Sequence, residues 1–252
     1  MTDTILMNEA GGVLELRFNR PDKKNAILGA MYDALTAALH DAAARPDVRA
    51  VLIGAEGDAF TAGNDIRDFL AMQGGLGDAP PARFIHAIAT CPKPLVAAVQ
   101  GPAVGVGTTL LLHCDLVYAS PAATFSVPFV DLGLVPEAGS SLLLPARIGH
   151  VRAAALLMLG EVMDAGAALQ SGLLTGIVPA AELTGHARAK ARALAAKPAA
   201  ALAATRVLMR GDPAALHDRM RAEEAAFTTA LASPEARAAF SAFLDRRTAK
   251  PS

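Results

Sequence analysis

The chain has 252 residues, of which 53% are hydrophobic and 4% aromatic, and its formal net charge is -1 at pH 7. This length suits one large α/β domain or a domain with an appendage, with a core built mainly from Ala, Leu and Val. The near-neutral charge offers no basic field for nucleic acid and no polybasic patch for a membrane surface, so we expect neither partner.

The cysteines and the N-terminal residues indicate a reducing compartment. Cys91 and Cys114 lie in apolar surroundings, and the first residues lack the basic-then-apolar order of a secretory signal, so we expect a cytoplasmic protein. Residues 94–112 carry no charge and are long enough to suggest a membrane span. Because Gly101 and Pro102 divide this window, it predicts a buried strand, a tight turn and a buried helix instead.

The first half of the chain alternates strand-like and helix-like segments. Period-two alternation in residues 12–19 and short apolar runs in residues 49–55 and 94–100 predict strands. Helical spacing predicts a helix over residues 27–44. Helices between short apolar strands imply crossover connections and a mainly parallel sheet covered on both faces, so the predicted class is α/β.

The second half ends in helices. Residues 72–82, rich in Gly and Pro, predict a mobile loop, and strand signals stop beyond about residue 185. Asp212 and Ser233, each followed by proline, predict two helix starts. The last predicted helix carries an apolar stripe, which is either intrachain core or a subunit interface: Ala236, Ala239, Phe240, Phe243 and Leu244.

Two glycine-containing turns could bind a ligand through their backbone. Residues 100–112 (QGPAVGVGTTLLL) follow a strand and open a helix, but they match neither the phosphate-loop nor the dinucleotide fingerprint. Their glycines either let a ligand approach unpaired helix amides or merely permit close helix–sheet packing. In the second turn, Gly63-Asn64 precedes Asp65, which is placed to cap a helix through Ile66. The two turns together make a candidate two-donor oxyanion hole, although the second is also compatible with an ordinary capped turn.

Glu137 is the outstanding candidate for an acid or base. The six histidines occupy positions typical of structural roles, and the sequence contains neither a G-x-S-x-G elbow nor Cys/His metal-ligand spacing. Glu137 lies in the mostly apolar stretch of residues 124–145. The alternative is that, after Pro136, it sits in the first turn of a helix and interacts with the helix dipole.

Four segments resemble, in order, the signature segments of the crotonase, or enoyl-CoA hydratase/isomerase, superfamily: NRPDKKNAI (19–27), FTAGNDIRDF (60–69), GPAVGVGTTLLLHCDLVYAS (101–120) and FSVPFVDLGLVPEAGSSLLLPARIG (125–149). The resemblance implies a crotonase-like spiral of β-β-α units with a C-terminal helical trimerisation region. It places a spiral core with an acyl-CoA site in residues 1–190 and an oligomerisation region in residues 191–252. It also implies a homotrimer or a dimer of trimers, and no cofactor or metal beyond the coenzyme A of the substrate.

The resemblance also implies roles for individual residues. The backbone amides of Asn64 and Val106 match the family's oxyanion hole, and Glu137 matches the catalytic glutamate of its isomerases. We expect an apolar wall to raise the pKa of Glu137 and to exclude water, and its expected members are Phe129, Val130 and Leu134. The family's coenzyme A contacts fall on Lys23, Lys24, Ala26, Ala62 and Ile66.

Two departures from the family pattern decide the expected reaction. Family hydratases use two glutamates, and the matching positions here are Thr109 and Phe129, so hydration by that mechanism is not expected. The residues around Glu137 are similar to peroxisomal-type 3,2-enoyl-CoA isomerases, in which one glutamate moves a proton so that the double bond shifts from C3 to C2. The alternatives are an enoyl-CoA hydratase, a ring-expanding epoxyphenylacetyl-CoA isomerase, and a non-catalytic acyl-CoA-binding or assembly subunit.

Overall fold

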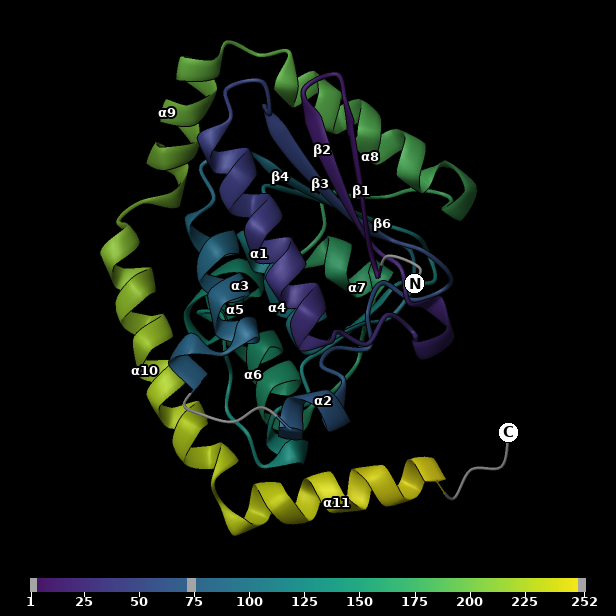
Figure 1. The fold of residues 1–252 in the computed structure, drawn as a ribbon, viewed down its shortest axis with the longest axis vertical. Helices are drawn as coiled ribbons and strands as arrows, with labels where there is room; N and C mark the ends of the chain where they lie inside the picture. The colour runs from purple at the N-terminus through teal and green to yellow at the C-terminus, as the bar shows by residue number, and fades with distance from the viewer. Residues whose placement is uncertain (1–3, 72–75, 249–252) are drawn as a thin grey trace.

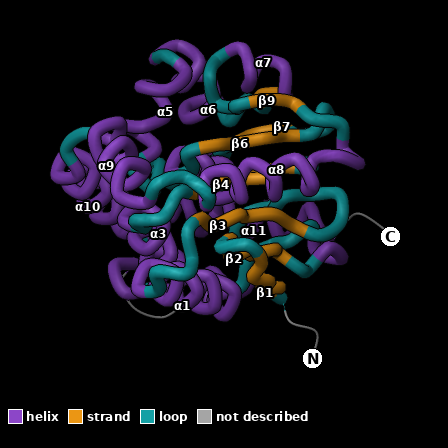
Figure 2. The backbone as a smooth tube through the Cα atoms, turned by 90° about the horizontal axis from the view of Figure 1, so that it is seen from above, coloured by secondary structure: helices purple, strands orange, loops and turns teal. Residues whose placement is uncertain are grey.

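The computed structural model of the chain describes residues 4–71 and 76–248. Its main feature is a six-stranded sheet with the order β1-β2-β3-β4-β6-β9, whose strands succeed one another in Figure 2. The strands are β1 (Ile5–Ala10), β2 (Val13–Phe18), β3 (Ala50–Ala55), β4 (Leu95–Val99), β6 (Leu116–Ala119) and β9 (Gly176–Ile177). Neighbouring strands are parallel except for the β1–β2 pair. The predicted α/β class and mainly parallel sheet are confirmed.

Both faces of this sheet are covered. Successive residues of β3 alternate between two hydrophobic clusters, with Val51 and Ile53 on one face and Ala50 and Leu52 on the other. The covering helices are α1 (Gly29–Ala44) and α3 (Pro80–Thr90) on the first face and α8 (Ala180–Ala195) on the second (Figure 1). Burial on both faces explains why β3 and β4 read as continuous apolar runs rather than as alternating strands.

A second, three-stranded sheet was not predicted from the sequence. It contains β5 (Ala103–Val104), β7 (Thr124–Ser126) and β8 (Met163–Asp164) in the order β5-β7-β8. Strands of two or three residues are too short to show a period, which is why the sequence gave no signal for them. This sheet holds the turn that follows β5, because the Gly105 N–H donates to the Ser126 carbonyl over 2.9 Å.

Shorter helices lie between the strands and the longer helices along the chain. They are η1 (Pro21–Lys23), α2 (Ile66–Ala71), η2 (Leu76–Asp78), α4 (Val106–Thr109), η3 (Leu110–His113), η4 (Val130–Leu132), α5 (Ser140–Ile148), α6 (His150–Leu159) and α7 (Ala165–Gln170). The predicted buried helix after Gly105 is therefore the α4–η3 pair. Asp65 caps α2 as predicted, since its Oδ1 accepts from the Arg67 N–H over 3.2 Å.

The prediction of a mobile loop over residues 72–82 is wrong where the structure can test it. Residues 72–75 lie outside the described part of the chain, but Leu76–Asp78 form η2 and Pro80 opens α3. Proline suits the first turn of a helix, because its fixed φ is already helical and its missing N–H has no acceptor there anyway. The prolines therefore mark the start of α3 rather than a loop.

The chain ends in three helices, α9 (Ala199–Arg210), α10 (Pro213–Leu231) and α11 (Pro234–Thr248), which follow the left edge and base of the molecule in Figure 1. Both predicted starts are confirmed, because Asp212 accepts from the Ala214 N–H and Ser233 from the Ala236 N–H, over 2.9 and 3.0 Å. Ala236 and Phe240 of the apolar stripe are buried within the chain's own core.

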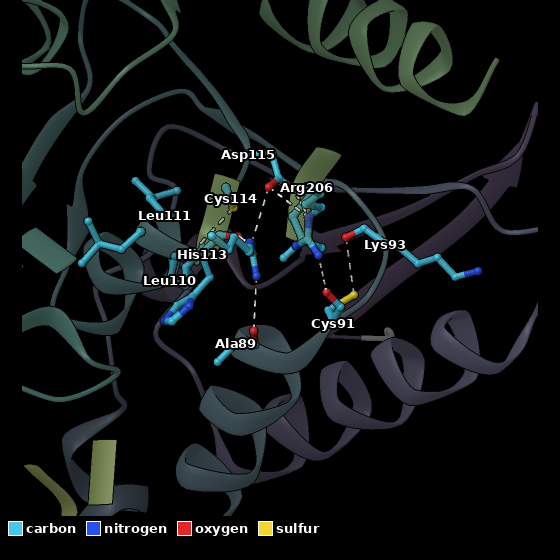
Figure 3. A network of polar contacts seen from close by, with 12 residues as sticks. Ala89, Cys91, Lys93, Leu110, Leu111, His113, Cys114, Asp115 and Arg206 are labelled. Atoms are coloured by element: carbon cyan, nitrogen blue, oxygen red, sulfur yellow. Dashed lines mark hydrogen bonds and ion pairs between the residues drawn. The ribbon is translucent and has the colours of Figure 1, made fainter. Parts of the chain in front are cut away.

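Helix α9 has no buried residue and is attached to the core through its arginines. Arg206 points at Asp115 and at the Cys91 carbonyl, as Figure 3 shows, with Nε 2.8 Å from Asp115 Oδ2 and Nη1 2.7 Å from the carbonyl oxygen. Arg210 adds a bond to the Ala89 carbonyl. Within residues 4–71 and 76–248, no helix combines the length and the apolar character that crossing a membrane requires.

Candidate active site

A cavity of about 190 Å³ gathers most of the predicted site residues. Its lining includes Ala26, Ala62, Asn64, Ile66, Val106, Phe129, Leu134 and Glu137. The C-terminal helices close the cavity on another side through Met220 and Phe227 of α10 and Phe240 and Phe243 of α11. Phe69 of α2 joins these helices, because its ring centroid lies 6.3 Å from that of Phe227 and 6.4 Å from that of Phe240. The cavity is therefore built from both ends of the chain.

The first amide facing this cavity belongs to Asn64. The Gly63 carbonyl accepts from the Ile27 N–H, and the Asp65 N–H donates to the Ile27 carbonyl, over 2.8 and 2.9 Å. The Asn64 N–H between them has no acceptor among the hydrogen bonds of the described residues. Glycine is required at residue 63, because its φ is +83° and a Cβ there would lie 2.9 Å from the Val104 carbonyl oxygen.

The second amide belongs to Val106, the first residue of α4. The Gly105 carbonyl accepts from the Thr108 and Thr109 N–H groups over 2.9 and 3.0 Å, while the Val106 N–H has no acceptor within residues 4–71 and 76–248. The two turns are linked, since the Val104 N–H donates to the Thr61 carbonyl over 3.0 Å. Two unpaired amides therefore line one cavity, as an oxyanion hole requires.

Glu137 lies in a loop, not at the start of a helix. Helix α5 begins at Ser140 with Gly139 as its N-cap, so Glu137 belongs to the preceding loop, and its placement in the first helical turn is wrong. Ala138 and Gly139 both have left-handed backbones, with φ of +60° and +69°, and this turn separates Glu137 from the helix. The proline that suggested a helix start precedes a turn that the sequence did not reveal.

The Glu137 carboxyl is held by one hydrogen bond and left free on its other side. Its Oε1 accepts from the Thr109 hydroxyl, while Oε2 has no hydrogen-bond partner in the described part of the chain. Burial raises the pKa of Glu137 from 4.5 to about 7, the Thr109 bond opposes that shift, and the negative charge of Glu223 adds to it. A carboxyl with this pKa can both take and return a proton near neutral pH.

Thr109 thus has a role that the sequence comparison did not suggest. Its position matches a hydratase glutamate, but in this chain its hydroxyl is a hydrogen-bond donor to the Glu137 carboxyl, which lines the same cavity as the free amides. The second matching position, Phe129, is buried and lines the cavity with its ring. An apolar ring and a neutral hydroxyl therefore replace the two hydratase carboxylates.

Two further carboxylates line the cavity and were missed from the sequence. Glu224 pairs with His86, whose Nε2 lies 2.6 Å from its Oε1. Glu223 is buried, and both of its oxygens accept hydrogen bonds from Gly139 and Ser141. The signal for Glu223 was its spacing, because it falls on the buried stripe of α10 between Met220 and Phe227.

Two buried groups of the site stay neutral near pH 7. Burial raises the pKa of Tyr32 well above its ordinary value, and the charge of Glu137 adds to this effect, so its hydroxyl donates to Asn64 Oδ1 over 2.5 Å. Burial lowers the pKa of His113 to about 4, and its Nε2 lies 2.9 Å from the Ala138 carbonyl oxygen. A carbonyl can only accept, so His113 is the donor. The sequence indicated a structural role for His113, and this contact agrees with it.

The predictions for three residues are changed or left open. Val130 was expected in the apolar wall, but it is 52% exposed on η4 and does not line the cavity, so that prediction is wrong. Because η4 turns the chain after Phe129, Leu132 lines the cavity instead. Lys23 and Lys24 are exposed outside the cavity, and Lys24 pairs with Asp58 over 2.5 Å, so their contact with coenzyme A stays a prediction.

Comparison with known proteins identifies the relatives of this chain. The family model described as enoyl-CoA hydratase/isomerase matches residues 8–251. The rat protein named enoyl-CoA delta isomerase 2 is 39% identical over 181 residues, 69% of this chain and 46% of the rat protein. A Rhodobacter capsulatus protein named "Probable enoyl-CoA hydratase" is 34% identical over 206 residues, 81% of this chain and 79% of that protein. The chain spans about half the length of the delta isomerases that it matches.

The fold agrees with these sequence relatives. The crystal structure of an enoyl-CoA hydratase/isomerase from Pseudoalteromonas atlantica is 39% identical and superimposes with a TM-score of 0.93, covering 97% of this chain and 98% of that one. The predicted crotonase fold with its C-terminal helices is therefore confirmed, and it includes the second sheet that was not predicted.

Proposed function

The chain belongs to the enoyl-CoA hydratase/isomerase family, and we propose that it is an isomerase that shifts the double bond of an enoyl-CoA from C3 to C2. One observation carries the proposal: a single carboxyl with a free oxygen and a pKa of about 7 shares a cavity with two unpaired backbone amides. Similarity to the rat delta isomerase supports the same choice.

The reaction that this arrangement supports is a 1,3-proton transfer. The Glu137 carboxylate takes the C2 proton, and the electrons of that C–H bond form a dienolate whose negative charge lies on the thioester oxygen. The amides of Asn64 and Val106 donate to this oxygen, and losing one such donor costs about 10²–10³ in rate in other enzymes. The dienolate then collapses, C4 takes the proton back from Glu137, and the product has its double bond between C2 and C3.

The cavity favours isomerisation over hydration. Adding water to a 2-enoyl thioester needs one group to activate the water and another to deliver a proton, and Thr109 and Phe129 supply no carboxyl for this purpose. Glu223 and Glu224 also line the cavity, but the oxygens of Glu223 are engaged by Gly139 and Ser141, and Glu224 is paired with His86. Glu137 is thus left as the proton carrier.

The outer contacts of the substrate are also proposals. Ala26, Ala62 and Ile66 line the cavity. The exposed Lys23 ends η1 and the exposed Lys24 follows it, and both can bind the phosphates of coenzyme A. We also infer that copies of the chain associate as trimers or dimers of trimers, because three apolar residues of α9 are 67–82% exposed: Val207, Leu208 and Met209. Light scattering of the purified protein checks the assembly.

A substrate panel tests the function. Purified protein is given a 3-enoyl-CoA, a 2-enoyl-CoA and an epoxidised aromatic-ring thioester, and the products are identified by mass and by the absorbance of the conjugated thioester. We expect 2-enoyl-CoA from the first substrate and no rapid hydration of the second. Rapid hydration of 2-enoyl-CoA, or saturable binding without turnover on the whole panel, would contradict the proposal.

A further inference from the structure

The N-terminus of α5 is capped by a residue from the other end of the chain. Gly139, the N-cap, has no side chain, and α5 has no side-chain cap bond of its own. Glu223 of α10 takes this place, with Oε2 accepting from the Gly139 N–H over 2.6 Å and Oε1 from the Ser141 N–H over 2.9 Å. The Ser141 hydroxyl adds a third bond of 2.5 Å. A carboxylate is the form that accepts on both oxygens, so a charged group caps this helix.

The capped turn is the one that presents Glu137. Ala138 lies between Glu137 and the N-cap and has a left-handed backbone. Residues other than glycine rarely adopt this conformation, so surrounding contacts must hold it. His113 bonds the Ala138 carbonyl from one side, and Glu223 bonds the next amide from the other. The direction in which the Glu137 side chain points is thus fixed by two buried polar groups from distant elements.

We propose that Glu223 is a positioning residue for Glu137. Its three hydrogen bonds fix the turn over residues 138–141, and its carboxylate keeps a negative charge close to the Glu137 carboxyl. The proposal rests on the proposed role of Glu137 as the base. It gives α10 a function in the site besides closing the cavity. It also means that α10 must be folded in place before the Glu137 side chain is oriented.

The charged and titratable groups around Glu137 leave Glu223 as the group that acts on it. Tyr32 from α1 and His113 from η3 are neutral near pH 7, because burial raises the pKa of the first and lowers that of the second. Glu224 Oε1 lies 2.6 Å from His86 Nε2, and Arg219 Nη1 lies 3.4 Å from Ser141 Oγ. Negative charge on Glu223 raises the pKa of Glu137 in addition to burial.

The test separates charge from geometry with two variants. Glu223→Gln has the same size but no charge. Its amide nitrogen cannot accept a hydrogen bond, so one of the two backbone N–H groups loses its acceptor. Glu223→Asp keeps the charge but is too short to reach both amides. The titration of Glu137 is followed by ¹³C NMR of protein labelled at glutamate carboxyls, with the Glu137 signal assigned by its loss in Glu137→Gln.

We expect Glu223→Gln to lower the pKa of Glu137 by about half a unit or more, with the midpoint of the kcat/KM profile moving to the same lower pH. Glu223→Asp should keep the pKa of Glu137 near 7 but lower kcat about tenfold or more, because the turn loses a bond. Asp218→Asn is the matched control, since it removes a carboxylate from the same helix at a position that is 68% exposed, and it should change neither quantity.

An unchanged Glu137 titration in folded Glu223→Gln would overturn the proposal. If that variant does not fold, full kcat in Glu223→Asp would overturn it as well. The NMR titration needs no substrate, so it reports on the coupling even if the chain does not isomerise enoyl-CoA. Failure of the proposed function appears separately, because the Glu137→Gln variant would then turn over 3-enoyl-CoA at the wild-type rate.

Discussion

The turns that present the two amides and the turn that presents the carboxylate line one cavity, but different bonds hold them. The amide turns are held mainly by backbone bonds, such as those from the Ile27 N–H to the Gly63 carbonyl and from the Gly105 N–H to the Ser126 carbonyl. The carboxylate turn is held mainly by side chains, since His113 and Glu223 bond its backbone and Thr109 bonds the carboxyl itself.

This difference predicts how each part responds to substitution. A backbone donor keeps its position when a side chain is changed, provided that the new residue fits the backbone conformation. The Glu137 turn depends instead on side chains that can be removed one at a time. The oxyanion hole should therefore tolerate most substitutions and fail at its glycines, whereas the behaviour of Glu137 should change gradually with each of its neighbours.

The largest effect is expected at the first amide turn. Gly63→Ala places a Cβ 2.9 Å from the Val104 carbonyl oxygen in a backbone at φ +83°, so the turn must move and carry the Asn64 amide with it. We expect kcat for 3-enoyl-CoA to fall by about 10²–10³. Gly149→Ala is the control, because Gly149 has φ +84° with no atom within 4 Å of its added Cβ. It should lose stability but not kcat, and a wild-type rate in Gly63→Ala would argue against the backbone account.

The second prediction concerns the contribution of the Glu137 carboxyl to the free energy of unfolding. Below its ordinary pKa of 4.5, Glu137 is protonated in both the folded and the unfolded chain. As pH rises, the unfolded chain ionises first, so the wild type loses stability until pH exceeds the folded pKa of about 7. The loss is roughly 3 kcal/mol at most, reduced by solvent that reaches the partly exposed side chain. Glu137→Gln should not show it, and parallel pH profiles in urea unfolding of the two proteins would contradict this.

The third prediction concerns Thr109, the side chain that bonds the carboxyl. Thr109→Val removes the hydroxyl that lowers the pKa of Glu137, so the midpoint of the kcat/KM profile should move up by about one unit. Turnover at pH 7 then falls several-fold, while the plateau at high pH is kept. Thr36→Val is the control, because Thr36 is a buried threonine whose hydroxyl bonds the Tyr32 carbonyl within α1. Equal shifts in both variants would show that the Thr109 bond is not the cause.

The smallest effect on rate is expected at Asn64. Asn64→Ala keeps the backbone N–H, so kcat should change less than about threefold, although the buried Tyr32 hydroxyl loses its acceptor. That loss should lower stability by about 1–3 kcal/mol, and adding Tyr32→Phe should recover most of it. A large loss of kcat in Asn64→Ala with normal stability would show that its side chain, rather than its backbone, serves the reaction.

The fold and the amide turns could be read from the sequence because their signals are local. The apolar run of residues 49–55 indicated β3, and Gly63 and Gly105 marked turns whose conformations few other residues adopt. The small second sheet gave no signal, since its strands are shorter than any period. Val130 was misplaced because η4 turns the chain, so the wall is not formed by consecutive residues.

The surroundings of Glu137 could not be predicted, because they come from distant parts of the chain. Glu223 is 84 residues from the amide that it caps, and His113 is 25 residues from the Ala138 carbonyl. Pro136 suggested a helix start near Glu137, but the left-handed backbone of Ala138 delays the helix to Ser140. The one signal for Glu223 in the sequence was its spacing, because it falls between Met220 and Phe227 on the apolar stripe of α10.

The central claim is that one desolvated carboxyl, Glu137, moves the proton. The direct measurement is kcat/KM for 3-enoyl-CoA against pH, for the wild type and Glu137→Gln. The account predicts that the wild-type value rises through a midpoint of about 7 to a plateau, and that the variant lies about 10²–10⁴ lower at every pH without that rise. A variant within tenfold of the wild type, or one that shows the same midpoint, would contradict it.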